Sequence, residues 1–305
     1  MFPLALAAIV SVTAVSDSYP HQSRDGTKLV FHSDRDGKNA LWMADGDGKN
    51  PKLLFAGGTL GTTPVTPKIS PDGQNIAFAM TAADASSPSD IFVLTIATGA
   101  VRRLTQGMGD ASHPVWNADG TRIFFNANRR APPATAAERE WSEIYSMAPD
   151  GTDVRQHSEC NAVCTYPAPS PDGRLLAYRK ILKSPGRQWN QEPMPLNSEV
   201  VVAPLAGGAA VNLSNHEAFD GWPTWTPDGR WVAFSSSRQG QPNVGQIYLV
   251  KPDASELHSV TEGPLSHAQP SFSADGRSMF VYELYETDEF GIGHIARVPI
   301  DRGAK

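Results

Sequence analysis

Six prolines occupy the same place in a repeated pattern, and the residue before each one has a side chain suited to binding. Each of these prolines lies five residues before an Asp-Gly step. The residues that precede them are Tyr19, Thr66, His113, Tyr166, Trp222 and Gln269. Aromatic rings stack on ligands, and hydroxyl, imidazole and amide groups exchange hydrogen bonds with them. If the fold brings these six residues together, they form a site for a small or sugar ligand, or for part of a protein or peptide. Alternatively, they only pack on their neighbours and fill the space between them.

Two long segments between predicted strands carry further candidates for binding. The segment at about 126–142 contains Arg129, and the segment at about 180–198 contains Arg187 and Trp189. Arginine and tryptophan suit the recognition of carboxylates, sugars and peptides. We therefore expect these residues to extend the same binding face, although solvated loops explain them equally well.

The Asp-Gly steps themselves predict how the chain is organised. They lie at Asp25, Asp72, Asp119, Asp172, Asp228 and Asp275, separated by 47, 47, 53, 56 and 47 residues. A Ser, Thr or Asn opens each turn, and glycine accepts the left-handed conformation that ends it. Short apolar runs rich in β-branched and aromatic residues follow each turn, which is typical of strands. A fixed period of this length indicates a propeller or another array.

The pattern predicts an all-β fold. Each repeat reads as a four-stranded antiparallel blade, and six blades form a six-bladed β-propeller that spans residues 1–305 as a single domain. Counting back from Asp25 places residues 6–11 where they can pair with the strand at 295–298 in the last blade. We predict that this N-terminal strand closes the ring and removes an exposed sheet edge. Alternatively, residues 1–16 are a signal peptide, because the apolar run from Leu4 to Val15 ends in small residues.

Charge and cysteine content narrow the classes of partner. The net charge is −6 and the sequence shows no basic stripe, so we expect no nucleic-acid partner. The longest apolar stretch is too short to cross a bilayer, so we expect no membrane span. Cys160 and Cys164 are the only cysteines; they could form a disulfide if the chain is exported, or remain free thiols. A four-ligand zinc site is not expected, because no second cysteine pair exists.

The repeats resemble a known family. Residues 223–238 read PTWTPDGRWVAFSSSR and residues 31–37 read FHSDRDG. This pattern is similar to the WD40-like PD40 repeats of the TolB propeller family, and the resemblance extends over essentially the whole chain. It implies a monomeric, noncatalytic protein of the periplasm, or of another extracytoplasmic compartment of the cell envelope. It also implies binding at the axial face, with no cofactor.

A sugar-acting enzyme is the alternative. Residues 267–273 resemble part of the oligogalacturonate lyase propellers, which bind a divalent metal near the axis. In that interpretation His113, His267 and Gln269 approach one divalent metal ion, which would acidify the proton beside a uronate carboxylate. Propellers of this kind also cover prolyl-oligopeptidase-type hydrolases, but the sequence contains no Gly-x-Ser-x-Gly motif.

Overall fold

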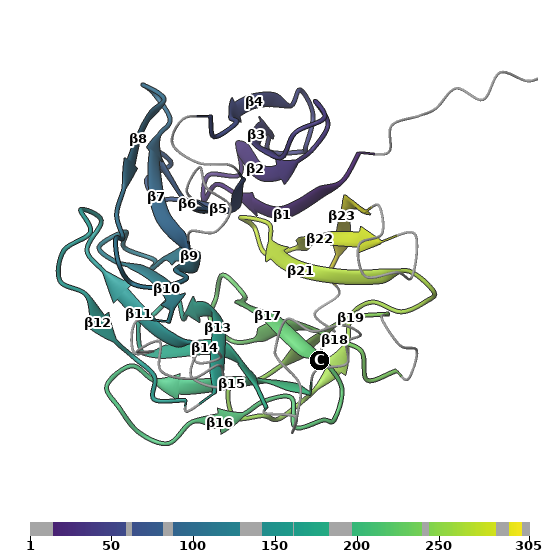
Figure 1. The fold of residues 1–305 in the computed structure, drawn as a ribbon. Coiled ribbons are helices and arrows are strands. Elements are labelled where there is room, and N and C mark those ends of the chain that lie inside the picture. Colours follow the sequence, from purple (N-terminus) through teal and green to yellow (C-terminus); the bar gives the residue numbers. More distant parts are fainter. Residues whose placement is uncertain are drawn as a thin grey trace, which may run out of the picture.

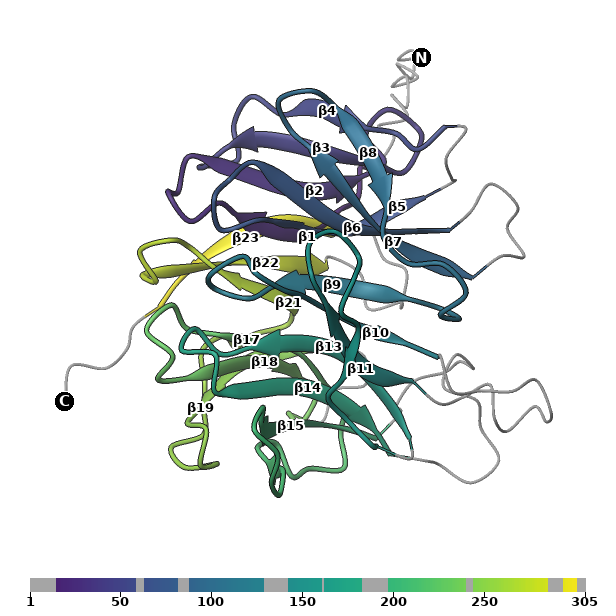
Figure 2. The ribbon, with the colours of Figure 1, turned by 90° about the vertical axis from the view of Figure 1, so that its left-hand side faces the viewer.

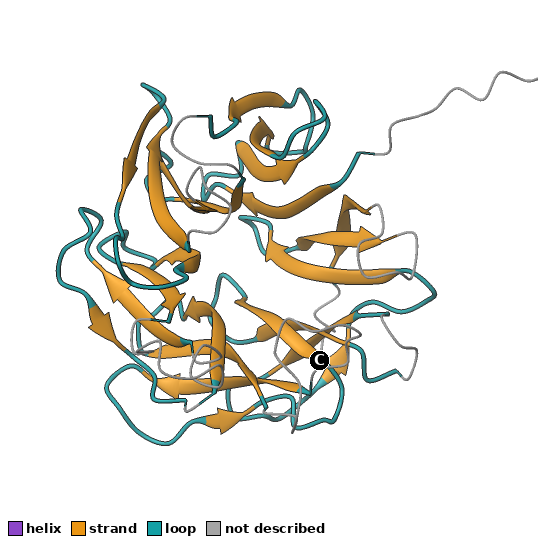
Figure 3. Cartoon of the chain, in the orientation of Figure 1, coloured by secondary structure: helices purple, strands orange, loops and turns teal. Residues whose placement is uncertain are grey.

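The chain folds into six β-sheets arranged around a common axis, as predicted (Figure 1). The computed structural model describes residues 15–58, 63–81, 88–128, 142–160, 162–182, 197–239, 244–284 and 293–300. Every regular element in these ranges is a strand (Figure 3). Seen from the side, neighbouring sheets are stacked face to face around the ring (Figure 2). The described ranges contain no helix of the length and apolarity that a membrane crossing requires.

Consecutive strands pair with each other, so each sheet is an antiparallel meander. Blade 1 consists of β1 (Asp17–Gln22), β2 (Lys28–Ser33), β3 (Ala40–Asp45) and β4 (Lys52–Phe55). Blade 2 consists of β5 (Pro64–Ile69), β6 (Asn75–Thr81), β7 (Ser89–Thr95) and β8 (Ala100–Arg103). Blade 3 consists of β9 (Ser112–Trp116), β10 (Ile123–Ala127), β11 (Glu143–Met147) and β12 (Arg155–Gln156). Blade 4 consists of β13 (Val163–Pro169), β14 (Leu175–Ile181), β15 (Ser198–Pro204) and β16 (Val211–Asn212). Blade 5 consists of β17 (Asp220–Trp225), β18 (Val232–Ser236), β19 (Gln246–Val250) and β20 (His258–Ser259). Blade 6 consists of β21 (Ser266–Phe272), β22 (Ser278–Leu284) and β23 (Gly293–Pro299).

The Asp-Gly turns have the chemistry predicted for them. In blade 2, the Ser70 hydroxyl donates to Asp72 Oδ1 over 2.5 Å, and the same oxygen accepts the Gln74 backbone N–H over 3.0 Å. The glycines of the six turns have φ between +64° and +74°, a region that favours glycine. Each turn therefore fixes the angle at which the innermost strand of a blade passes into the second.

The innermost strand of every blade contains a bulge at the residue before its proline. The register between the first and second strands shifts at this point in all six blades. The residue before each proline has φ of +52° or +53°, which is the left-handed region. Proline suits the next position because it has no N–H to leave unpaired in the ladder. A bulge re-aims side chains, and here it does so at the same level of all six blades.

Apolar side chains fill the space between neighbouring blades. Phe125 of blade 3 packs with Ile91 of blade 2, and Phe234 of blade 5 packs with Val200 of blade 4. Comparable clusters lie between blades 1 and 2, blades 3 and 4, and blades 5 and 6. Each blade thus buries both of its faces, which a single sheet could not do.

The ring closes between blade 6 and blade 1. Phe280 of β22 packs into a buried cluster with Leu29, Phe31 and Trp42 of blade 1. On the turn side, the Ala274 backbone N–H donates to the side-chain oxygen of Gln22 over 2.8 Å. Blade 6 has three strands within the described ranges, and the predicted closing strand at 6–11 lies outside the described residues. The signal-peptide alternative for 1–16 falls almost entirely on the same undescribed stretch.

A buried hydrogen-bonded brace recurs in blades 2 to 5. In blade 4, the Ser214 hydroxyl donates to the Glu199 carboxylate over 2.5 Å and accepts the Val200 backbone N–H over 3.0 Å. The matching pairs are Asp90 with Thr105, Glu143 with Ser158, and Gln246 with Thr261. The brace ties the segment after the fourth strand to the start of the third, and it explains why these repeats end in Leu-Thr, Leu-Ser or an equivalent pair.

Candidate functional site

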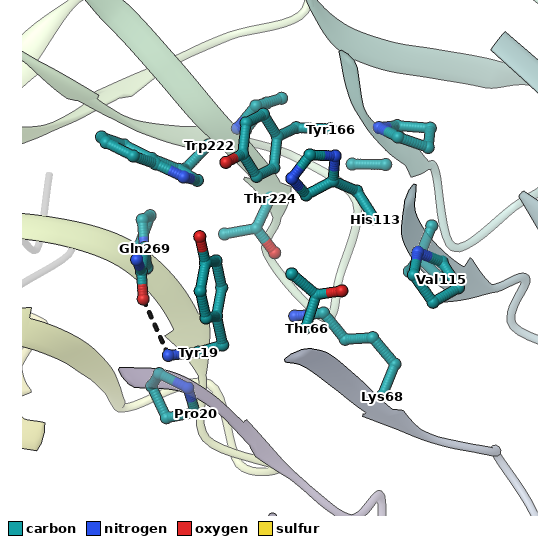
Figure 4. Close-up of a pocket in the computed structure, with 15 residues that line it drawn as sticks. Tyr19, Pro20, Thr66, Lys68, His113, Val115, Tyr166, Trp222, Thr224 and Gln269 are labelled. Carbon is teal, nitrogen blue, oxygen red and sulfur yellow. Dashed lines mark hydrogen bonds between the residues drawn. The ribbon is translucent and has the colours of Figure 1, made fainter. Parts of the chain in front are cut away.

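The six residues that precede the repeat prolines line one pocket on the axis of the ring (Figure 4). They come from β1, β5, β9, β13, β17 and β21, one from each blade. The left-handed bulge at each position turns the side chain toward the axis, whereas a regular strand would continue its alternation. The cavity has a volume of about 80 Å³. A small chemical group fits this space, whereas drug-sized ligands occupy several hundred Å³.

Contacts between blades hold these side chains in place. The His113 and Tyr166 rings lie 3.7 Å apart between centroids, and Trp222 meets Tyr166 edge-on at 5.8 Å. On the opposite side, the Tyr19 backbone N–H donates to Gln269 Oε1 over 2.7 Å. Figure 4 shows Tyr19 pointing toward Tyr166 from the far side of the ring. The pocket is therefore walled by packed aromatic groups.

Burial sets the electrostatics of the pocket. It raises the pKa of the Tyr19 hydroxyl well above its usual value, and the nearby Tyr166 raises it further. Burial also lowers the pKa of His113 to about 4, despite the opposing effect of the hydrogen bond that its Nδ1 donates to Asn126 Oδ1. At neutral pH both groups are uncharged and can exchange hydrogen bonds with a ligand.

Two cations near the axis were not among the candidates identified from sequence. Lys68, the residue after Pro67, lines the axial pocket, and burial lowers its pKa to about 8. Arg179 on β14 is 7% exposed, and its guanidinium lies 4.4 Å from the Phe219 ring centroid. The repeat could have placed Lys68 near the axis, because the residue after each repeat proline lines one or both of the axial cavities. Arg179 lies on a second strand and gave no comparable signal.

A second, wider cavity opens on the side of the Asp-Gly turns. Its volume is about 300 Å³, and Lys68 lies between it and the axial pocket, lining both. Trp116 and Trp225 line this cavity and link adjacent blades, because their indole N–H groups donate to the backbone oxygens of Lys68 and Ala168 over 3.1 and 2.8 Å.

The remaining predicted candidates lie elsewhere. Arg129, Arg187 and Trp189 fall outside the described residues. His267 does not line the axial pocket: its Nε2 lies 2.8 Å from Glu283 and its Nδ1 lies 3.2 Å from Gln246.

The metal-binding interpretation required His267 to meet His113 and Gln269. The bulge at Gln269 turns that side chain to the axis and leaves His267 between blades 5 and 6. Among the described residues, no three or more His, Cys, Asp or Glu side chains are grouped in a way that could hold a metal ion.

The two cysteines, whose state the sequence left open, form a disulfide. The Cα atoms of Cys160 and Cys164 lie 6.4 Å apart. The Glu143 carboxylate accepts the Cys160 backbone N–H over 3.0 Å, which anchors the same loop to the brace in blade 3. The disulfide thus fixes the entry to the innermost strand of blade 4, three residues before Tyr166 begins its turn toward the axis.

Comparisons with known proteins agree with this architecture. Residues 58–188 match the family model for the TolB beta propeller domain, PD40. The chain is 32% identical to "Uncharacterized peptidase YuxL" of Bacillus subtilis over 38% of its own length and 17% of the relative's. It is 24% identical to "Tol-Pal system protein TolB" of Francisella tularensis over 68% of its length and 43% of the relative's. The chain therefore spans less than half of either relative.

Solved structures show the same fold. TolB from Acinetobacter baumannii superposes with a TM-score of 0.65 at 16% identity, covering 84% of this chain and 57% of that one. An oligogalacturonate lyase in complex with manganese superposes with a TM-score of 0.59 at 14% identity, covering 95% and 91%. At these identities the similarity shows only that the chains share the propeller fold. The chemistry of the axial pocket has to be argued from the residues of this chain.

Proposed function

Since the chain is a TolB-like six-bladed β-propeller of PD40 repeats, we propose that it is a noncatalytic binding protein of the cell envelope, which holds its ligand at the axial pocket. The observation that carries the proposal is the convergence of six side chains, one from each blade, on a single cavity. Four of the six are aromatic or imidazole rings, and the backbone adopts the left-handed conformation at all of them. Strained backbone that recurs at one cavity is a feature of functional sites.

The size of the pocket favours a protein segment over a free small or sugar ligand. A cavity of about 80 Å³ takes one side chain or one chain end, and the rest of the segment would lie on the surrounding face. The contacts among His113, Tyr166 and Trp222 support this mode of binding, because a rigid pocket needs little ordering when its ligand enters.

The disulfide supports a location outside the cytoplasm. Disulfides persist in oxidising compartments such as the bacterial periplasm and are rare in the cytosol. The Cys160–Cys164 bond therefore agrees with the periplasmic or otherwise extracytoplasmic location that the TolB-like repeats suggest.

Selection of random peptides displayed on phage tests the binding function directly. Peptides would be selected on the wild-type chain and then measured against a variant that combines His113→Gln, Tyr166→Leu and Trp222→Leu. We expect the selected peptides to lose at least about tenfold in affinity, because well-packed aromatic anchors commonly contribute 2 kcal/mol or more to binding.

The matched control combines His216→Gln with Trp231→Leu, since neither residue lines an axial cavity. This control should bind the peptides as the wild type does. Equal binding by the wild type and a folded triple variant would exclude the axial pocket as the binding site.

A further inference from the structure

Lys68 places an ammonium group on the axis of the ring. It lies on β5 directly after the bulge, and the equivalent residues of the other blades are His21, Val115, Ala168, Thr224 and Ser271. Figure 4 shows its side chain extending into the pocket alongside Thr66. Because Lys68 lines both cavities, a ligand that enters the axis from either side meets its ammonium group.

This charge has no counter-ion among the residues that the structure describes. Lys68 forms no ion pair with any residue that the structure describes, and the described lining of both cavities includes no Asp or Glu. Two acids act on other groups near the axis: Asp110 acts electrostatically on His113, and Asp220 acts on Arg179. On a chain with a net charge of −6, the axis is thus locally positive. A cleft lined by charge of one sign concentrates ligands of the opposite sign.

Hydrogen-bond donors around the pocket also have no acceptor. The Thr66 side chain is 5% exposed, and its hydroxyl has no hydrogen-bond partner within the described ranges. The buried indole N–H of Trp222 has none there either. Arg179 lies behind this lining; its Nε and Nη2 have no hydrogen-bond partner among the described residues, and Tyr166, Tyr19 and Asp220 act on it electrostatically. Most buried polar groups in proteins are paired, so donors that face one cavity indicate an acceptor supplied by a ligand.

A carboxylate satisfies these requirements together. It carries the missing negative charge, accepts several hydrogen bonds at once and has no proton to donate at neutral pH. Its three heavy atoms fit a cavity of about 80 Å³. The oxygen atoms would lie among the Lys68 ammonium, the Thr66 hydroxyl and the Trp222 indole N–H.

We propose that a carboxylate of the bound protein segment enters the axial pocket and pairs with Lys68. This inference rests on the proposed function and specifies the chemistry of its ligand. The carboxylate is either the end of the segment or an acidic side chain within it, and the two sources share the same recognition.

Three peptides distinguish these sources: acetyl-GGEGG-amide, acetyl-GGGGG with a free carboxyl end, and neutral acetyl-GGQGG-amide. Their binding to the full chain would be measured by saturation-transfer NMR at constant ionic strength. We expect at least one of the two acidic peptides to bind about tenfold or more tightly than the neutral one. Binding by one acidic peptide identifies the source, and binding by both means that either source suffices.

The variant Lys68→Met should abolish this preference, and Lys68→Gln serves as a second variant if the first fails to fold. Lys52→Met is the matched control, because Lys52 is exposed on the outer strand β4. Equal binding of acidic and neutral peptides, binding of none, or an unchanged preference in both folded Lys68 variants would overturn the proposal. A phage-selected peptide whose binding depends on His113, Tyr166 and Trp222 but not on Lys68 would contradict the proposed carboxylate pairing. The same result would still support the proposed binding function.

Discussion

At the scale of single residues, His113 links the chemistry of the axis to the stability of the fold. Burial lowers its pKa to about 4, below the usual value of 6.5. Between these two values the unfolded chain binds a proton that the folded chain does not bind. The contribution of neutral His113 to stability is therefore complete above pH 6.5 and decreases as the pH falls toward 4.

The variant His113→Gln should consequently lose less stability on acidification than the wild type. Between pH 7.5 and pH 5 we expect the difference in the free energy of unfolding to be on the order of 1–2 kcal/mol. Urea unfolding at a series of pH values measures it. His216→Gln is the control, because His216 is exposed. Identical pH slopes for the wild type and His113→Gln would contradict the assignment of this proton to His113.

The six axial residues could be identified from sequence, and the charges around them could not. The prolines repeat in phase with the turns, so the residues before them were predictable as a ring. Lys68 has five uncharged or weakly basic equivalents, so no periodic signal marked it as different in role. Arg179 lies on the second strand of blade 4, and the pairing of β13 with β14 places it opposite Thr165, next to Tyr166.

At the scale of the blade, the brace between the third and fourth strands is the recurrent polar element of the interior. Removal of its hydroxyl leaves a buried carboxylate and a backbone N–H without a partner. Ser214 is 4% exposed, so water does not readily replace the lost group. Unsatisfied buried groups of this kind are costly, and more so when one of them is charged.

The variant Ser214→Ala should therefore lower the free energy of unfolding by about 1–3 kcal/mol. Ser214→Thr keeps the hydroxyl, and threonine occupies the same place in blades 2 and 5 as Thr105 and Thr261. We expect the threonine variant to remain close to the wild type in thermal and urea unfolding. Equal losses in both variants would show that the volume at this position matters and the hydrogen bonds do not.

The blade as a whole followed from the sequence, but the brace and the bulge did not. Alternating turns and apolar runs predicted four strands for each repeat, and the pairing agrees in five blades. The Leu-Ser and Leu-Thr pairs were visible as repeat ends. Their partners lie 14 or 15 residues earlier, and only the folded sheet brings Glu199 to Ser214.

At the scale of the whole molecule, stability depends on the apolar interfaces that join each blade to the next around the ring. The cluster around Phe280 is the one that joins the two ends of the described chain. Phe124 is a matched interior position, because it is similarly buried between blades 3 and 4.

The variant Phe280→Ala should cost about 3–5 kcal/mol, as large-to-small changes in a core do. If the ring is closed by this interface, Phe124→Ala should cost a similar amount, and unfolding should follow one transition by both fluorescence and circular dichroism. A loss for Phe280→Ala that is far smaller than for Phe124→Ala would show that the ring is not held together there.

The number of blades was predictable because each repeat carries its own turn. The way in which the ring closes could be predicted only in part. The structure shows side-chain packing and hydrogen bonds between blades 6 and 1. The pairing of residues 6–11 with the strand at 295–298 remains a prediction.

The bulge before each repeat proline has a consequence for how such a protein changes over time. All six axial side chains leave the backbone with nearly the same φ, near +52°. A substitution at any of them would alter what the axis recognises while the scaffold stays in place. Each position is found by counting back six residues from a repeat aspartate. Mutation or design can therefore change the recognition of the axis one residue at a time at these six positions, next to the charge that Lys68 supplies.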